Sequence, residues 1–204
     1  MKIQEIRTIV TCPDKQSFVV VKIITDEGVY GVGEGTKNGR ELAVATLLDK
    51  HLAPTLIGRD PIASEDIWKF LYKGAYWRGG PIEMAAIAAI DMALWDIKGK
   101  VAGLPVYKLL GGPTRKKLLT YAHTSGRDFA ECVDTMLAAK ARGFKVIRSQ
   151  VQIPGMPGSY GAEDKNDPDL ARSQAERLPY EGAWEPEPFI RTMPKLMAHL
   201  RAHV

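Results

Sequence analysis

The chain has 204 residues, of which 45% are hydrophobic and 25% charged, and its formal net charge is +4 at pH 7. This balance is typical of a globular protein, and no apolar run approaches the roughly 20 residues that a membrane span needs. The polar start MKIQEIRT does not resemble a signal peptide, and the basic run at 115–117 is too short for a nucleic-acid surface. We therefore expect a soluble, cytoplasmic protein that binds neither membranes nor nucleic acid, and mild positive charge suits a carboxylate substrate.

The first 76 residues predict a small sheet followed by helices. Residues 2–10, 17–25 and 29–33 are rich in β-branched residues, and Asp26-Glu27-Gly28 is typical of a hairpin turn. Apolar residues then recur at helical spacing from 39 to about 56, and a second helix is predicted over 64–76. These elements indicate an α+β domain with a three-stranded antiparallel meander.

A third helix is predicted from Gly80 to about Val101 and is apolar on nearly every face, so it should be buried. Gly103 and Pro105 supply the stop signal. A short helical turn follows and ends at Gly111-Gly112. We place the boundary of the first domain there, at residue 112.

The sequence changes its period after residue 112. Residues 117–122 read as a strand, 128–141 as an amphipathic helix and 144–147 as a second strand, so a βαβ unit with parallel strands is expected. The segment 150–186 is rich in Pro and Gly, and its place after a strand favours a lid loop. A final helix is predicted over 189–202, in which Pro194 marks a kink or an early turn.

Arg148 and Tyr160 form the most informative polar pair. Arg148 stands just after the second predicted strand, and Tyr160 lies twelve residues further on. A guanidinium can lower the pKa of a nearby phenol, which would make the tyrosine a general base for a proton next to a carboxylate. Spacing alone leaves open that a surface arginine and a loop tyrosine never meet.

Other patterns predict no site. His199 and His203 have a spacing that metal ligands use, but no third ligand is evident. The run 31–35 (GVGEG) fails as a dinucleotide motif, because the sheet before it reads as antiparallel. Cys12 and Cys132 are isolated and read as reduced, mainly packing residues.

Several longer motifs resemble one enzyme superfamily. AIDMALWDIKGK followed by GLPVYKLLGG is similar to the hinge between capping domain and barrel in the mandelate racemase-like branch of the enolase superfamily. FKVIRSQ, IPGM and YG, with TKNGREL at 36–42 and YAHTSG at 121–126, resemble the D-mannonate dehydratase group, which includes proteins labelled starvation-sensing. The resemblance runs essentially from end to end.

The resemblance implies a capping domain over 1–112 and the start of a (β/α)8 barrel over 113–204, with the lid loop at 150–186. A barrel of this kind needs about 250 residues, and 113–204 hold only two βα units. We therefore expect an incomplete barrel, truncated after its second βα unit. Its open edge favours a homo-oligomer or another chain that completes the core.

The resemblance also implies an activity, that of a hydro-lyase that converts D-mannonate to 2-keto-3-deoxy-D-gluconate. Tyr160 assisted by Arg148 would remove the proton α to the carboxylate, and Asn38 and His123 would contact the substrate. Mg²⁺ would stabilise the resulting charge through ligands expected beyond residue 204, so the 204-residue chain alone should be inactive.

Two alternatives stay open. The chain could be a non-catalytic, truncated paralogue that acts in oligomerisation or regulation. It could also serve a dehydratase of another acid sugar, such as D-gluconate, because Glu34 replaces the aspartate usual in the dehydratase group and the lid sequence is individual.

Overall fold

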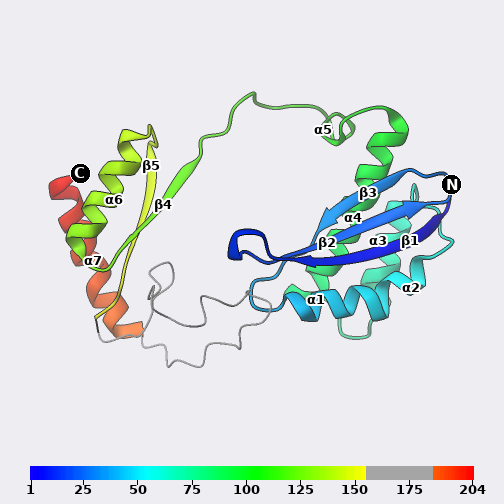
Figure 1. Ribbon diagram of the computed structural model, residues 1–204, viewed down its shortest axis with the longest axis horizontal. Coiled ribbons are helices and arrows are strands. Elements are labelled where there is room, and N and C mark those ends of the chain that lie inside the picture. The colour runs from blue at the N-terminus through cyan, green and yellow to red at the C-terminus, as the bar shows by residue number, and fades with distance from the viewer. Residues whose placement is uncertain (155–185) are drawn as a thin grey trace. The chain divides into compact units, whose positions relative to one another are not determined.

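The structure, a computed structural model, describes residues 1–154 and 186–204. These residues fall into two compact units: the first holds residues 1–114, and the second holds the described residues from Arg115 onward. In Figure 1 the first unit is coloured from blue to green and the second from yellow-green to red. Each unit has its own hydrophobic core, so each can bury apolar surface by itself.

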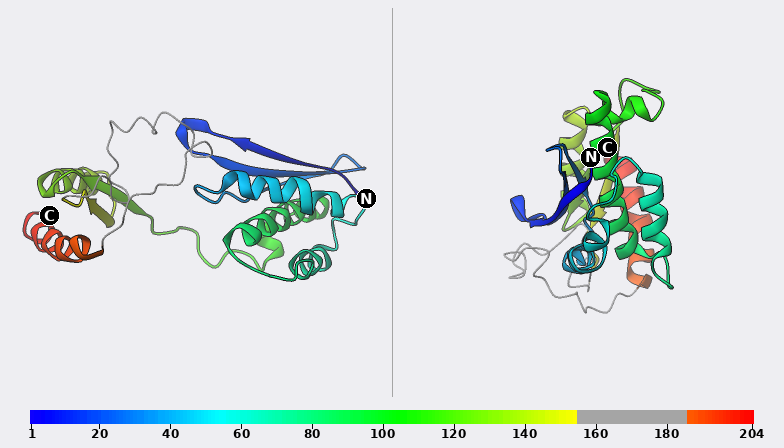
Figure 2. Two further views of the ribbon diagram at one scale, coloured as in Figure 1. Left: turned by 90° about the horizontal axis from the view of Figure 1, so that it is seen from below. Right: turned by 90° about the vertical axis from the view of Figure 1, so that its right-hand side faces the viewer.

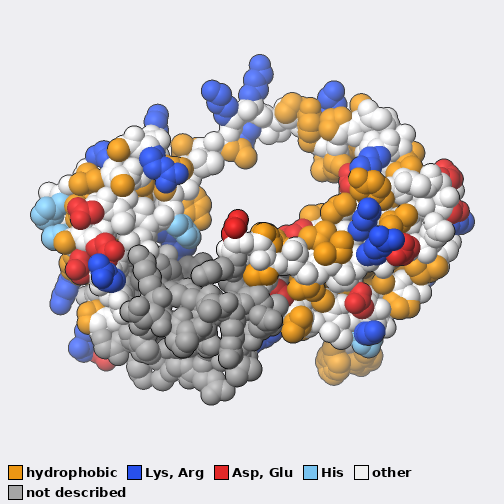
Figure 3. Space-filling model, viewed as in Figure 1, with side chains coloured by type: hydrophobic (Ala, Val, Ile, Leu, Met, Phe, Trp, Pro, Cys, Tyr) orange, Lys and Arg blue, Asp and Glu red, His pale blue; other side chains and the backbone are white. Residues whose placement is uncertain are grey.

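An antiparallel sheet forms one layer of the first unit, and the predicted meander is confirmed. Along its central strand Val19, Val21 and Ile23 are buried while the residues between them are half-buried, as a sheet with one covered face requires. Figure 2 shows the helices on one side of the sheet only, and Figure 3 shows hydrophobic and charged side chains mixed over the surface of this unit. The strands, in spatial order, are β1 (Ile3–Thr11), β2 (Phe18–Thr25) and β3 (Tyr30–Glu34), with a short turn η1 (Pro13–Lys15) between the first two.

The helical layer departs from prediction between residues 39 and 56. The sequence predicted one regular helix there, whereas the structure widens its middle into π-helical turns. Pro54 has no N–H to donate to the preceding turn, which accounts for the irregular hydrogen bonding just before it. The helical elements are α1 (Glu41–Leu47), η2 (Leu48–Leu52), α2 (Ala53–Leu56), α3 (Ser64–Lys73), α4 (Pro81–Ala102) and α5 (Val106–Leu109).

Helix α4 lies at the centre of the first core, as its apolar sequence predicted. Each buried Ile or Leu side chain contributes about 1.5–3 kcal/mol relative to an exposed one. The helix ends where Gly103 adopts φ 63°, a left-handed C-cap. Its fully buried residues include Ala86, Ile87, Ala89, Ile90, Ala93, Leu94 and Ile97.

The glycines of β3 allow the sheet to approach α4 unusually closely. A Cβ placed on Gly33 would lie 1.9 Å from the carbonyl oxygen of Ala89, and one on Gly31 would lie 1.9 Å from that of Ala93. No side chain fits at either position. The run 31–35 is therefore a packing surface between strand and helix rather than a nucleotide motif.

Side chains from α4 also cover the outer edge of β3. The Asp96 Oδ2 atom accepts the backbone N–H of Val32 at 2.9 Å, and the Lys100 Nζ atom donates to the carbonyl oxygen of Tyr30 at 2.7 Å. Lys100 and Asp96 are themselves paired at 2.7 Å. This arrangement occupies backbone groups that an edge strand would otherwise offer to another chain.

The second unit is a βαβ unit with a further helix. Its two strands pair in parallel, and α6 packs against both strands and against the last helix. The elements are β4 (Tyr121–Gly126), α6 (Phe129–Ala141), β5 (Val146–Val151) and α7 (Pro186–His203), and their core consists of Cys132, Val151, Ile153, Leu196 and Leu200.

The strand boundaries in this unit correct the sequence prediction. Both strands begin later and continue further than the predicted 117–122 and 144–147. His123 and Arg148 are each the third residue of a strand, whereas the predicted strands stopped at residues 122 and 147, one residue before each of them. The polar residues next to His123 and Arg148 predict loops, but in the structure the two parallel strands pair through their backbone N–H and C=O groups. β5 also includes residues 150 and 151, which the prediction had given to the lid.

The two cysteines differ in exposure. Cys132 is buried, but Cys12 is exposed, so the prediction of a packing role is wrong for Cys12.

The helices within residues 1–154 and 186–204 include none that is long and apolar enough to cross a membrane.

Candidate functional site

The parallel pair β4–β5 has one face covered by helix α6 and one face exposed. Side chains alternate along each strand, and the ladder sets His123 directly opposite Arg148. The two residues lie on the exposed face, together with Tyr121 and Val146. The opposite face contributes Val151, which is buried in the core with Cys132.

His123 and Arg148 contact each other on that exposed face. The Arg148 Nη1 atom lies 3.1 Å from the His123 Nε2 atom. Because a guanidinium has no acceptor, Arg148 must donate and Nε2 must accept, which places the imidazole proton on Nδ1. The ring of Tyr121 stands 5.2 Å from that of His123, tilted by 59°. A cation, an imidazole and a phenol thus line one surface.

The close fit of α6 to β4 explains how this surface is held. A Cβ on Gly126 would lie 2.6 Å from the backbone nitrogen of Cys132, so a larger residue would push the helix away. Asp128 caps the helix by accepting the N–H of Glu131 at 2.8 Å. Burial raises the pKa of the Cys132 thiol, which therefore acts as a packing group and not as a nucleophile.

Asn38 belongs to the first unit, where it lies in the turn between β3 and α1. The N–H of Arg40 donates to the carbonyl oxygen of Lys37 at 2.8 Å and closes the turn. Gly39 takes φ 71°, which favours glycine. Thr36 anchors the approach to the turn, because its Oγ1 atom accepts the N–H of Val19 at 3.0 Å. Asn38 is therefore exposed on a short, well-anchored turn.

Sequence reasoning missed Glu41, a buried carboxylate beside this turn. Its side chain is 1% exposed. The Oε1 atom accepts the N–H of Gly39 at 3.1 Å, while the Oε2 atom has no hydrogen-bond partner in the part of the chain that the structure describes. One signal could have found it: Glu41 precedes Val44, Ala45 and Leu48 by three, four and seven residues, which places it on the buried face of the helix.

The structure brings together two of the four predicted site residues. His123 and Arg148 are in contact, and Asn38 lies on its own turn in the other unit. Tyr160 lies outside the described residues, as does most of the predicted lid. The roles of all four residues remain predictions.

Metal-binding side chains do not cluster in the parts of the chain that the structure describes. No group of three or more His, Cys, Asp or Glu side chains in residues 1–154 and 186–204 could hold a metal ion. His199 and His203 stack with ring centroids 4.2 Å apart, and the His203 Nδ1 atom lies 2.7 Å from the carbonyl oxygen of His199. Their spacing thus reflects ring packing at the end of α7.

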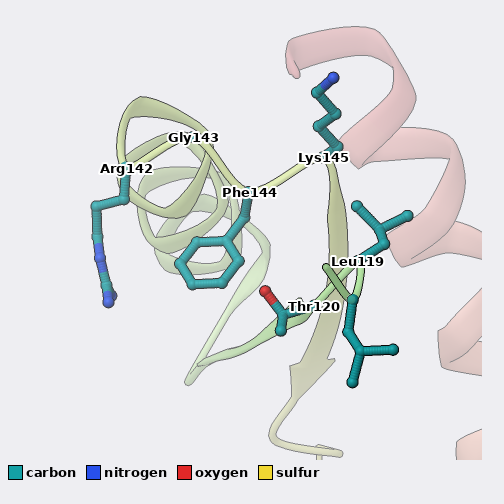
Figure 4. Close-up of a pocket in the computed structure, with 7 residues that line it drawn as sticks. Leu119, Thr120, Arg142, Gly143, Phe144 and Lys145 are labelled. Atoms are coloured by element: carbon teal, nitrogen blue, oxygen red, sulfur yellow. The ribbon is translucent and has the colours of Figure 1, made fainter. Parts of the chain in front are cut away.

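A cavity of about 370 Å³ opens at the other end of the parallel pair, where both strands begin. Figure 4 shows Leu119 and Thr120 on the segment before β4, and Arg142 to Lys145 on the segment between α6 and β5. Neither His123 nor Arg148 lines this cavity. We therefore do not assign this cavity to catalysis.

The sequence of this chain is similar to those of known proteins. Residues 1–111 match the family described as mandelate racemase / muconate lactonizing enzyme, N-terminal domain. The chain is 50% identical over 201 residues to a D-mannonate dehydratase from a Sphingomonas species, and 48% identical over 201 residues to D-galactonate dehydratase family member RspA from Halomonas elongata. Both alignments take in 98% of this chain and 49% of the relative, so the chain spans about half the length of these curated relatives.

This chain also matches about half the length of a solved structure. The crystal structure of an enolase from Pantoea ananatis with bound D-gluconate and Mg matches with a TM-score of 0.83 and 41% identity. The match covers 100% of this chain and 51% of that chain.

Proposed function

The chain belongs to the mandelate racemase / muconate lactonizing enzyme family of the enolase superfamily, and on that basis we propose that it forms part of a sugar-acid dehydratase. Residues 1–112 would be the capping domain, and 113–204 would begin a (β/α)8 barrel. The relatives named D-mannonate dehydratase and D-galactonate dehydratase family member support this proposal. The activity would be that of a hydro-lyase, which removes water from a hydroxy acid.

The observation that carries the proposal is the contact between His123 and Arg148 on the exposed face of β4–β5. Helices cover the other face, so in a closed barrel this face would point to the interior. Arg148 would attract the substrate carboxylate and lower the pKa of the Tyr160 phenol, so that the phenolate could take the α proton. His123 would donate through Nδ1–H or rotate to contact a sugar hydroxyl, and Asn38 would also contact the substrate.

Mg²⁺ is the cofactor we propose, because the Pantoea ananatis enolase binds it with D-gluconate. The described residues form no group able to hold a metal ion. The ligands would therefore come from outside them, in the half of the fold that the relatives possess and this chain does not span. A bound Mg²⁺ would supply positive charge beside the substrate carboxylate.

D-Mannonate is the substrate we favour, because it is named for the relative at 50% identity. D-Gluconate is the second candidate, since it is bound in the Pantoea ananatis structure. A homo-oligomer is also proposed: Tyr76 and Trp77 are 88% and 85% exposed, and aromatic side chains of this kind are the usual anchors of protein interfaces. A non-catalytic, regulatory chain remains the alternative outside enzymes.

The experiment joins residues 1–204 to the C-terminal half of the Sphingomonas relative and supplies the fused enzyme with D-mannonate, D-gluconate and Mg²⁺. We expect Mg-dependent formation of a 2-keto-3-deoxy acid, faster from D-mannonate. The unfused 204-residue chain should show no turnover. A folded fused enzyme that dehydrates neither acid would contradict the proposed function and favour the regulatory alternative.

A further inference from the structure

We propose that Glu41 is a positioning residue, which holds the turn that presents Asn38. This inference rests on the proposed function for its catalytic meaning, since Asn38 is there assigned to the substrate. The structural part stands on the hydrogen bonds and burial around residues 37–41.

The turn is linked to α1 in two ways: the Val44 N–H donates to the Arg40 carbonyl oxygen at 3.1 Å, and the Gly39 N–H donates to the Glu41 side chain. Its outer residues, Lys37 to Arg40, are all exposed. The bond from the Arg40 N–H to the Lys37 carbonyl oxygen closes the turn but joins two exposed residues and does not reach the core. The link from the Gly39 N–H to the Glu41 Oε1 atom, at 3.1 Å, ties the turn to a side chain that is 1% exposed.

Glu41 is well suited to act as such an anchor. It lies in the first turn of α1, on the same face as Val44 and Ala45, both of which are buried. A negative charge at this end of a helix is favoured by the backbone dipole. The Glu41 side chain has few alternative conformations because it is packed. The Gly39 N–H that it binds is therefore held in a fixed position.

The second carboxylate oxygen argues that the residue is kept for more than stability. Oε2 is buried and has no hydrogen-bond partner among residues 1–154 and 186–204, a condition that costs free energy. A leucine of similar size would fill the same space without that cost. A carboxylate at this position is thus explained by the one contact it makes, the contact to Gly39.

Two matched substitutions separate positioning from simple packing. Glu41→Leu keeps the volume and removes the acceptor, whereas Glu41→Gln keeps an acceptor oxygen. Amide hydrogen exchange of the 204-residue chain reports on both. We expect protection of the Gly39 amide to fall about tenfold or more in Glu41→Leu and to stay within about threefold in Glu41→Gln, with the β2 amides unchanged in both. Glu41→Ala serves the same test if the leucine variant does not fold.

The outcomes distinguish this inference from the proposed function. Unchanged Gly39 protection in Glu41→Leu, or an equal fall at Gly39 and throughout β2, would overturn it. In the fused enzyme we expect Glu41→Leu to raise KM for D-mannonate about tenfold and to lower kcat less, because Asn38 binds substrate. An inactive wild-type fused enzyme would contradict the proposed function while the exchange data still decide the role of Glu41.

Discussion

Replacing Gly33 with alanine tests the packing on which the whole first unit depends. Gly33 is the fourth of the five residues of β3, and its missing side chain lets the strand approach α4. The added Cβ would stand 1.9 Å from the Ala89 carbonyl oxygen, whereas real Cβ atoms essentially never come closer than 3.0 Å to such an atom. The obstacle is backbone inside a helix and cannot rotate away.

The loss of stability follows from the movement that the added Cβ would force on β3 and α4. The strand and α4 would have to separate by about 1 Å, and such a gap forfeits a quarter to a half of each dispersion contact along it. Overpacked cores typically lose about 1–3 kcal/mol, and here α4 supplies 7 of the 17 buried residues of the core. We therefore expect Gly33→Ala to lower the free energy of unfolding by about 3 kcal/mol or more.

The assay is urea unfolding followed by circular dichroism, with Gly28→Ala as the matched control. Gly28 has φ 80° but nothing within 4 Å of its added Cβ, so only backbone strain acts there, about 1 kcal/mol. If Gly33→Ala proved no more destabilising than Gly28→Ala, the close packing of β3 on α4 would be refuted.

Three further predictions follow from the described side chains. Burial raises the pKa of Asp91, so its charged form opposes folding: Asp91→Asn should raise Tm at pH 7, and the gain should vanish as pH falls through the raised folded pKa to below the ordinary 3.8. A gain that persisted at low pH would show another cause. A thiol reagent should label Cys12 in the native chain and reach Cys132 only after denaturation; equal labelling of both would mean that the second core is loose. The double change Asp96→Ala and Lys100→Ala should uncover the β3 edge and cause concentration-dependent association in size-exclusion chromatography, which an unchanged elution volume would contradict.

Local patterns predicted the sheet and the long helix of the first unit well, whereas the π-helical turns at Leu48–Leu52 were not predicted. β2 is rich in β-branched residues and α4 is apolar on nearly every face, so their structures followed from their sequences. The tight contact at Gly33 did not, because glycine in a strand is equally consistent with a bulge or a turn. Only the position of Ala89, across the contact between β3 and α4, reveals the packing role of Gly33.

The candidate site was harder to predict, because its strands are polar where they matter. His123 and Arg148 looked like residues beyond strand ends, since local β-propensity is low there. Their pairing depends on a parallel partner about 25 residues away, which no local signal contains. Glu41 was overlooked for a related reason: a glutamate at the start of a helix is usually solvated, and its burial depends on elements from elsewhere in the chain that pack against α1.

The most direct test of the proposed function compares Arg148→Met with Lys145→Met in the fused enzyme. Each change removes one exposed cation. Lys145 lies directly before β5 and Arg148 lies within it, but only Arg148 contacts His123. We predict that kcat/KM for D-mannonate falls by about 10²–10⁴-fold in Arg148→Met and changes little in Lys145→Met. Equal activity of the two variants would contradict a catalytic role for the exposed face of β4–β5.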